Sequence, residues 1–242
     1  MKRAIIVGAT SGIGYEVAQI LISEGWTVGI AGRRKENLKE LRMKAPERVY
    51  IKQIDIKDST AGDKLLSLVK EMGGMDLYLH SSGIGHQNSS LDESIELNTL
   101  ETNGTGFTRM VGTVFRYFKD NGGGHIAVIS SIAGTKGLGI APAYSATKRF
   151  QNTYIDALEQ LSNIQGLNIS FTDIRPGFVA TNLLNDNKHY PMLMNVKDVA
   201  KDIVKALNRK KRVTIIDWRY RILVFFWKMI PRFIWKRMKV KN

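Results

Sequence analysis

The stretch Val7-Gly8-Ala9-Thr10-Ser11-Gly12-Ile13-Gly14 decides the fold, because a short apolar run ends in it and an amphipathic stretch follows at once. Gly8 permits a tight turn, Gly12 lets the backbone approach a pyrophosphate, and Gly14 lets a helix pack close to the strand. The first turn of that helix offers unpaired N–H groups and a positive dipole end to phosphates. The stretch therefore predicts a dinucleotide-binding loop. The residues expected to bind there are Gly8, Thr10, Ser11, Gly12, Ile13 and Gly14.

Outward from this loop, short β-branched runs alternate with longer amphipathic stretches. This alternation is typical of βαβ units, whose right-handed crossovers build a parallel sheet with helices on both faces. We expect one α/β domain over residues 1–217, a doubly wound (Rossmann) seven-stranded parallel sheet, and a basic tail over 218–242. The expected strands are Arg3–Val7, Thr27–Ala31, Val49–Ile54, Asp76–His80, His125–Ser130, Asn168–Ile174 and Val213–Asp217. The expected helices cover residues 13–24, 35–44, 60–72, 93–119, 143–163 and 196–208.

Composition excludes several classes of protein. Hydrophobic residues make up 43% of the chain and charged residues 24%, as in ordinary globular proteins. The absence of cysteine excludes disulfides, thiolate metal sites and cysteine nucleophiles. The four histidines show no i, i+4 pair, so we expect no metal site. Because the glycine loop begins at Gly8, we expect no signal peptide and a cytoplasmic protein.

The end of the second expected strand indicates which dinucleotide binds. An NAD site places an acidic side chain there to bond the ribose 2′-hydroxyl, but this sequence has Gly32-Arg33-Arg34-Lys35. Guanidinium groups bind a 2′-phosphate in a forked geometry, so Arg33 and Arg34 favour NADP(H), although a solvated basic turn is the alternative. Asp55 and Ile56 end the third strand, where Asp55 either bonds the adenine amino group or forms a turn.

Four polar residues predict a catalytic site. Tyr144 and Lys148 are four residues apart on one expected helix, so the ammonium lies beside the phenol and is expected to lower its pKa. A phenol with a lowered pKa can give and take a proton near neutral pH. Ser131, after the fifth strand, can donate a hydrogen bond to a substrate carbonyl oxygen. A Tyr-x-x-x-Lys pair alone is common, and its value here comes from Ser131, Asn103 and the glycine loop.

The order and spacing of these motifs resemble the short-chain dehydrogenase/reductase family, in its NADP-preferring form, over about residues 1–217. The resemblance implies that Tyr144 is the acid/base, that Ser131 polarises the carbonyl, and that Lys148 lowers the phenol pKa and holds the nicotinamide ribose. It also implies that Asn103 positions a relay water. The resemblance rests on Gly8, Gly12-Ile13-Gly14, Asp55, Asn103, Ser131, Tyr144-Ser145-Ala146-Thr147-Lys148 and Arg175-Pro176-Gly177-Phe178-Val179-Ala180-Thr181. The implied cofactor contacts further include Arg33, Gly83, Tyr144, Lys148, Pro176, Gly177, Val179 and Thr181, the last on the nicotinamide carboxamide.

The sequence departs from the family pattern in two places. The family usually has Asn-Asn-Ala-Gly after the fourth strand, where this chain has His80-Ser81-Ser82-Gly83. This exchange alters the packing expected on the adenosine side, and Ser81 can replace the second Asn as a hydrogen-bonding brace. Val7 stands where the family usually has Thr, which removes one local hydrogen bond. Neither departure touches the four expected catalytic residues.

The expected activity is NADP(H)-dependent interconversion of a ketone or aldehyde and an alcohol. A lid over residues 182–195 either binds an apolar or lipid-like substrate or simply packs on the body. A non-catalytic NADP-binding sensor or scaffold is the alternative, and the complete set of four catalytic residues disfavours it. The apolar residues of the lid are Leu183, Leu184, Tyr190, Met192, Leu193 and Met194.

The basicity of the chain lies almost wholly at its C-terminal end. Residues 205–242 carry 13 lysines and arginines against one acidic residue, whereas residues 1–204 carry 23 against 21. The apolar run Ile222–Trp227 is far shorter than the roughly 20 residues that cross a bilayer. Interleaved aromatic and basic residues favour either a helix at an anionic membrane surface, on its inner face, or a contact in a homo-oligomer, a dimer or tetramer. Nucleic-acid binding rests on charge alone and is not expected.

Overall fold

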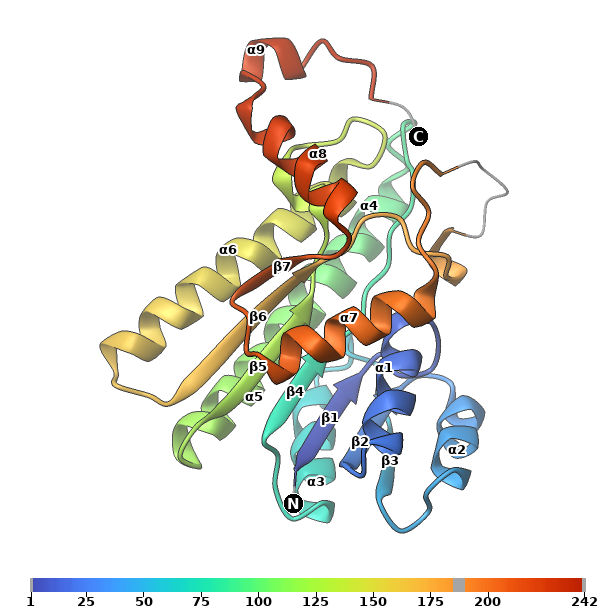
Figure 1. The fold of residues 1–242 in the computed structure, drawn as a ribbon, viewed down its shortest axis with the longest axis vertical. Helices are drawn as coiled ribbons and strands as arrows, with labels where there is room; N and C mark the ends of the chain where they lie inside the picture. The colour runs from blue at the N-terminus through green and yellow to red at the C-terminus, as the bar shows by residue number, and fades with distance from the viewer. Residues whose placement is uncertain (1, 185–189, 241–242) are drawn as a thin grey trace.

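The computed structural model describes residues 2–184 and 190–240, and in these residues seven parallel strands form one sheet (Figure 1). The strand order is β3-β2-β1-β4-β5-β6-β7, so the connections reverse direction between β1 and β4. A crevice opens at such a switch point, beyond the carboxyl ends of the strands. The expected doubly wound parallel sheet is confirmed. The strands are β1 Arg3–Val7, β2 Thr27–Gly32, β3 Val49–Gln53, β4 Leu77–His80, β5 Gly124–Ile129, β6 Ile169–Arg175 and β7 Val213–Ile215.

Helices cover both faces of the sheet, and each face has its own core. Leu21, Leu38 and Ile203 bury α1, α2 and α7 on one face. Leu65 and Phe107 bury α3 and α5 on the other face, which α6 also covers. Because both faces are covered, the strands read as nearly continuous apolar runs. These helices are α1 Gly12–Ser23, α2 Lys35–Met43, α3 Ala61–Glu71, α4 Glu93–Leu100, α5 Phe107–Asp120, α6 Pro142–Ile164 and α7 Val196–Asn208.

The expected helix over 93–119 is divided in the structure. A π-helical segment, η1 Glu101–Gly106, joins α4 to α5, so the three segments form one continuous helix. A side chain on Gly106 would meet Ile56 at 2.9 Å, so this continuous helix passes very close to the segment that follows β3. Single π-helical turns are frequent at functional sites because they re-aim the side chains around them. Here η1 carries Asn103.

The first turns of the tail belong to the packed body. Helix α8, Trp218–Met229, begins after Asp217, whose carboxylate accepts a hydrogen bond from the Arg219 N–H at 2.8 Å. Tyr220 and Val224 are 0% and 1% exposed and join the core beside α7. A short helix, α9 Arg232–Trp235, follows. Figure 1 shows α8 and α9 together at the end of the molecule opposite the chain's N-terminus. In the part of the chain that is described, no helix is long and apolar enough to cross a membrane.

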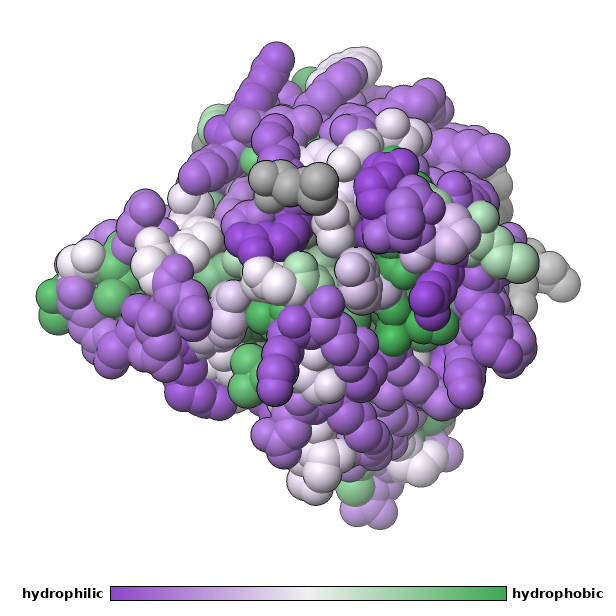
Figure 2. Space-filling model, turned by 90° about the horizontal axis from the view of Figure 1, so that it is seen from below, coloured by the Kyte–Doolittle hydropathy of each residue, from purple (hydrophilic) through white to green (hydrophobic). Residues whose placement is uncertain are grey.

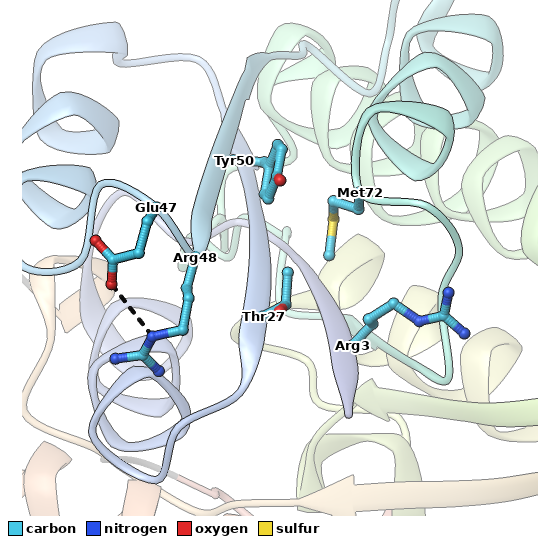
Figure 3. A pocket seen from close by; sticks show the side chains of 6 residues that line it. All are labelled: Arg3, Thr27, Glu47, Arg48, Tyr50 and Met72. Carbon is cyan, nitrogen blue, oxygen red and sulfur yellow. Dashed lines mark hydrogen bonds and ion pairs between the residues drawn. The ribbon is translucent and has the colours of Figure 1, made fainter. Parts of the chain in front are cut away.

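The amino-terminal edge of the sheet carries a separate pocket of about 510 Å³. Figure 2, which views the molecule from below, shows that hydrophilic residues cover most of this end and that apolar residues form small scattered patches. Figure 3 shows the Arg48 side chain directed to Glu47, with which it forms an ion pair. Because Arg3 and Thr27 begin β1 and β2, the pocket lies at the opposite end of the sheet from the glycine loop. Its lining residues are Arg3, Thr27, Glu47, Arg48, Tyr50 and Met72.

Candidate active site

The glycine loop closes tightly on the switch point of the sheet. Gly8 has φ +91°, and a side chain on it would collide with the Ser82 backbone nitrogen at 2.5 Å. A side chain on Gly14 would lie 2.4 Å from the Gly8 carbonyl oxygen, so α1 packs directly on the turn. Ser11 precedes α1 in extended conformation, and its side chain does not cap the helix. The N–H groups at the start of α1 therefore remain available to an anionic ligand.

Of the two neighbouring arginines, Arg34 is the one bound to this loop. Its guanidinium donates to Thr10 Oγ1 at 2.9 Å and to Ser11 Oγ at 2.5 Å. Arg33 is exposed, and its carbonyl oxygen accepts from the Gln53 side chain at 2.8 Å. Both cations stand at the carboxyl end of β2. Ser11, Arg33 and Arg34 thus border the same part of the crevice.

At the end of β3, Asp55 adopts the turn that the sequence left open as an alternative. Its Oδ1 accepts the Lys57 N–H at 3.0 Å, as in an Asx-turn. Ile56 is buried, and its carbonyl oxygen accepts from Arg109 at 2.8 Å. One carboxylate can serve a turn and a ligand at once, because it has more than one acceptor site.

Ser131 follows β5 and begins a short 3₁₀ turn, η2 Ile132–Thr135. Its Oγ accepts the Ala133 N–H at 3.1 Å, which fixes the side chain at the start of the turn. The backbone Ile132 N–H donates to Pro176 O at 3.1 Å, so the turn is also held to the segment after β6. Ser131 is only 5% exposed. Its hydroxyl acts on Tyr144 and partly opposes the rise of the Tyr144 pKa.

Tyr144 lies in the first turn of α6 and is partly buried. A side chain on Gly85 would come within 2.7 Å of the Tyr144 ring, so the loop after β4 packs flat against the phenol. Burial raises the pKa of Tyr144, and this effect outweighs that of Ser131. The sequence led us to expect a lowered pKa. The direction is the opposite because loss of water disfavours the phenolate more strongly than the neighbouring groups favour it.

Lys148 is 5% exposed, and its ammonium lies 5.7 Å from the centre of the Tyr144 ring. Its Nζ donates to the Ile129 carbonyl oxygen and to Gln151 Oε1, both at 3.1 Å. Burial lowers the pKa of Lys148 to about 8, and the negative charge of Asp173 partly opposes this fall. Lys148 therefore carries its charge at neutral pH although it is buried.

Whereas Lys148 belongs to α6, Asn103 is fully buried in η1. Its side chain accepts the Ile84 N–H at 2.9 Å and donates to the Ile84 carbonyl oxygen at 2.7 Å. The backbone carbonyl oxygen of Asn103 accepts a hydrogen bond from Gln151 Nε2 at 2.9 Å. The Gln151 amide therefore links the Asn103 backbone to the Lys148 ammonium. The relay water that the family resemblance implies at Asn103 stays a prediction.

The segment after β6 reaches the glycine loop. A side chain on Gly12 would meet Thr181 Cγ2 at 3.3 Å, so Thr181 borders the loop. Pro176 holds the Ser131 turn, and Val179 is buried beside Met194 in a bridge. Gly177 is required because a side chain there would lie 2.2 Å from the Tyr220 ring of α8. Of the expected lid, residues 185–189 lie outside the described part of the chain.

His80 is buried and Ser81 is half-buried where the chain departs from the family pattern after β4. His80 is 1% exposed, and burial, followed by the charge of Lys148, lowers its pKa to about 3. His80 is therefore neutral at pH 7 and adds no second cation beside Lys148. The Ser81 hydroxyl lies where a side chain on Gly14 would meet it at 2.9 Å, which places Ser81 against the glycine loop. Gly83 brings the same loop over Lys148, 3.6 Å from Nζ by the same measure.

These residues fit a nicotinamide dinucleotide. Gly8 and Gly14 keep the loop in direct backbone contact with its neighbours, and α1 presents N–H groups that its own cap does not use. Arg33 and Arg34 lie at one end of this cradle. Ser131, Tyr144 and Lys148 lie at the other. Among the described residues, no group of His, Asp and Glu side chains could hold a metal ion.

Comparison with known proteins identifies the class. The family model described as short chain dehydrogenase matches residues 2–191. An uncharacterized oxidoreductase of Myxococcus xanthus is 29% identical over 238 residues, which cover 95% of this chain and 93% of the relative. The NADP-dependent 3-hydroxy acid dehydrogenase YdfG of Escherichia coli O6:H1 is 30% identical over 182 residues, or 72% of this chain and 71% of that protein. The chain belongs to the short-chain dehydrogenase family and is an oxidoreductase.

A solved structure shows the same fold. The 3-ketoacyl-(acyl-carrier-protein) reductase from Brucella melitensis, complexed with NADH, superimposes with a TM-score of 0.79 at 23% identity. The match covers 89% of this chain and 96% of that one. Members of the family use a nicotinamide cofactor, and the fold alone does not decide between NADH and NADPH.

Three residues of the site were missed by sequence reasoning. Gln151 stands three residues after Lys148 and seven after Tyr144, so helical periodicity places it on the same face of α6. Gly85 follows Gly83 by two residues, a spacing that indicates a second close backbone contact. Tyr220 packs on Gly177, and no local pattern in the sequence indicates that contact because 43 residues separate them.

Proposed function

We propose that this chain is an NADP(H)-dependent reductase that interconverts a ketone or aldehyde and an alcohol. The observation that carries the proposal is the convergence of Ser131, Tyr144 and Lys148 beside a loop that only glycines can form. Bound nicotinamide supplies a hydride to the carbonyl carbon, or accepts one in the reverse direction. Everything else in the reaction is a matter of holding the substrate oxygen and moving one proton.

The side chains divide this work among them. Ser131 donates a hydrogen bond to the substrate oxygen and polarises the carbonyl group. Tyr144 gives its phenolic proton to that oxygen, and the Lys148 ammonium stabilises the phenolate that remains. Gln151 and Asn103 are positioning residues, because Gln151 accepts a hydrogen bond from Lys148 and itself donates one to the Asn103 backbone. The high pKa of Tyr144 in the buried site favours the protonated phenol that reduction requires.

NADP(H) is the proposed cofactor because two cations and no carboxylate follow β2. The N–H groups of α1 would bind the pyrophosphate, and Arg33 and Arg34 the 2′-phosphate. Asp55 and Ile56 would bind the adenine, and Thr181 the carboxamide. The name of the Escherichia coli relative, an NADP-dependent dehydrogenase, supports this choice.

We propose an apolar or lipid-like substrate. Leu183 and Leu193 lie in the segment that follows Thr181, and their side chains are 44% and 48% exposed. Tyr190 is buried against Phe178, with ring centres 4.8 Å apart. Part of this segment therefore packs on the body, which was the alternative to substrate binding. We infer that these exposed leucines can contact an apolar chain of the substrate.

A substrate screen tests the activity. Purified protein is mixed with NADPH, and in parallel with NADH, and absorbance is followed over a panel of ketones and long-chain aldehydes and keto-esters. We expect oxidation of NADPH with carbonyls that carry apolar chains. Tight binding of NADPH without turnover on any carbonyl would instead favour the non-catalytic sensor or scaffold. A preference for NADH would show that the cofactor assignment is wrong.

We also propose a homo-oligomer. A shallow, largely apolar hollow lies where η1, α5 and α6 meet, and Leu100 and Phe150 are 47% and 42% exposed there. A second copy of the chain can cover this surface. Sedimentation of the wild type and of Phe150→Glu is the test, and we expect the variant to be the smaller species. Equal sedimentation of the two would remove this surface as the contact.

A further inference from the structure

Helix α8 has two apolar faces, and only one of them is covered. Tyr220, Leu223 and Val224 follow helical spacing and pack on the body, and Trp227 continues this face and contacts the Trp235 ring. Trp218, Ile222, Phe225 and Met229 follow the same spacing on the other side, and each is exposed by about half or more. A surface helix of a globular protein ordinarily presents polar residues on its outer side. The outer face of α8 therefore lacks the expected polar character.

The exposed apolar surface continues beyond α8. Phe226, Phe233, Ile234 and Met238 are 59%, 60%, 44% and 45% exposed. Together with the outer face of α8, they account for eight of the 19 large apolar side chains that are exposed among the described residues. We call this set, residues 218–238, the tail surface. Contiguous exposed apolar surface of this kind marks a binding surface.

Charge decides what covers the tail surface. Seven cations and no acidic residue lie within residues 218–240, and one of the seven, Arg219, is paired with Asp217. A symmetric contact with a second copy would bring two such sets of like charges together, which is unfavourable. An anionic lipid surface complements both features, because its headgroups attract the cations and its acyl region takes the aromatic and aliphatic side chains. The cations are Arg219, Arg221, Lys228, Arg232, Lys236, Arg237 and Lys239.

We propose that the tail surface binds the face of an anionic lipid bilayer, with α8 lying in the plane of the interface. The buried side of the tail connects this contact to the proposed active site. Tyr220 Oη accepts the Phe178 N–H at 3.1 Å and donates to the Pro191 carbonyl oxygen at 3.0 Å. Trp235 Nε1 donates to the Gly137 carbonyl oxygen at 2.8 Å. The tail thus rests on both loops that flank Ser131 and Thr181.

Because the tail bonds to these two loops, docking in this way would bring the proposed active site close to the lipid. An apolar carbonyl compound dissolved in the bilayer can then reach Tyr144 without crossing water, a consequence that rests on the proposed function. Docking itself does not rest on it, since the tail surface needs no cofactor or substrate. The two can therefore fail separately.

Vesicle co-sedimentation of the full chain tests the proposal. The vesicles are phosphatidylcholine alone and phosphatidylcholine with phosphatidylglycerol in equal parts. We expect much stronger binding to the anionic vesicles than to phosphatidylcholine alone. We expect it to weaken with added salt without vanishing, because salt screens the charges and leaves the apolar contact. Removal of residues 218–242 is a poor test, since it also removes the core residues Tyr220 and Val224.

Substitutions on the outer face keep the core intact. The triple variant Ile222→Ser, Phe225→Ser, Met229→Ser is compared with Met43→Ser, Leu66→Ser, Ile164→Ser, which removes three exposed apolar side chains elsewhere. The charge variant Arg232→Glu, Lys236→Glu, Arg237→Glu is compared with Lys197→Glu, Lys201→Glu, Lys205→Glu on α7. Each tail variant is expected to lower partitioning at least about tenfold, and each control to retain most of it.

Three results would overturn the proposal. One is equal partitioning of the tail variants and their controls, and another is equal binding to vesicles with and without phosphatidylglycerol. The third is a change of the serine variant from dimer to monomer on gel filtration with vesicle binding unaltered, which assigns the surface to a second copy. Tyr144→Phe binds vesicles like the wild type if docking is independent of turnover. Vesicle binding by a protein that reduces no carbonyl would leave docking intact and refute only the proposed activity.

Discussion

At the scale of the residue, Lys148 is charged, and both of its hydrogen-bond partners are neutral. Its hydrogen bonds go to a backbone carbonyl and to the Gln151 amide, and burial lowers its pKa to about 8. Below that pH the ammonium can stabilise a phenolate, and above it the charge is lost. We therefore expect kcat/KM for carbonyl reduction to fall as pH rises through about 8. A profile that stays level to pH 10 would contradict a catalytic charge on Lys148.

Gln151 gives this pH dependence a sharper test. Gln151→Leu removes the acceptor that helps the ammonium, so the Lys148 pKa should fall further and the decline in kcat/KM should begin at a lower pH. A purely structural role for Gln151 would lower stability and leave the profile in place. The exposed Gln165→Leu, at the end of the same helix, is the matched control. The measurement is kcat/KM from pH 6 to 10 for all three proteins.

The two arginines after β2 should have different effects. Charge-assisted hydrogen bonds contribute about 1.5–3 kcal/mol each, so each alanine variant should weaken NADPH binding roughly tenfold or more. Arg34 also holds Thr10 and Ser11, so Arg34→Ala should weaken NADH binding as well. Arg33→Ala should leave NADH binding nearly unchanged. Fluorescence titration with both cofactors checks this, and unaltered NADPH affinity in both variants would exclude a 2′-phosphate site there.

At the scale of the element, Tyr220 of α8 fixes the loop that follows β6. Its hydroxyl bonds Phe178 and Pro191, and its ring is fully buried. Tyr220→Phe leaves the Phe178 N–H without this partner and should lower the free energy of unfolding by about 1–3 kcal/mol. Tyr220→Ala leaves a cavity as well and should cost about 3–5 kcal/mol. Urea unfolding measures both, and a smaller loss for alanine than for phenylalanine would contradict the packing.

The sequence predicts most elements to within two residues, because buried parallel strands are short apolar runs and their helices are amphipathic. The boundary of β2 moves by one residue, from Ala31 to Gly32, and α7 begins and ends where expected. The π-helical turn at Asn103 could not be predicted. It depends on the close approach of Gly106 to Ile56, two segments that only the folded sheet brings together.

In the candidate site, too, some features can be predicted from the sequence and others depend on the folded structure. Residues in sequence motifs, such as Ser131, Tyr144 and Lys148, are recognisable from order and spacing. The direction of the Tyr144 pKa is not, because it depends on how much water the folded chain excludes from the phenol. The division of the chain at residue 217 stays a prediction, although the burial of Tyr220 and Val224 ties the start of the tail to the body.

At the scale of the whole molecule, two buried histidines couple stability to pH. Burial lowers the pKa of His80 to about 3 and that of His125 to about 4, against about 6.5 in an unfolded chain. Between these values the unfolded chain binds more protons, so the free energy of unfolding should fall as pH drops from 6.5 toward 4. His80→Asn should reduce that slope, and the exposed His86→Asn should not. Urea unfolding at pH 7 and pH 5 gives the comparison, and identical slopes for all three proteins would contradict it.

In the proposed reaction, Tyr144 donates the proton in an NADPH-dependent reduction. The most direct test measures NADPH affinity and turnover together in the wild type and in Tyr144→Phe, which removes one oxygen and leaves the ring packed on Gly85. Because proton transfer by a positioned group contributes about 10²–10⁴-fold, turnover should fall by at least about a hundredfold while NADPH affinity stays within a factor of about two. Turnover equal to that of the wild type, with the same substrate and cofactor, would contradict the account.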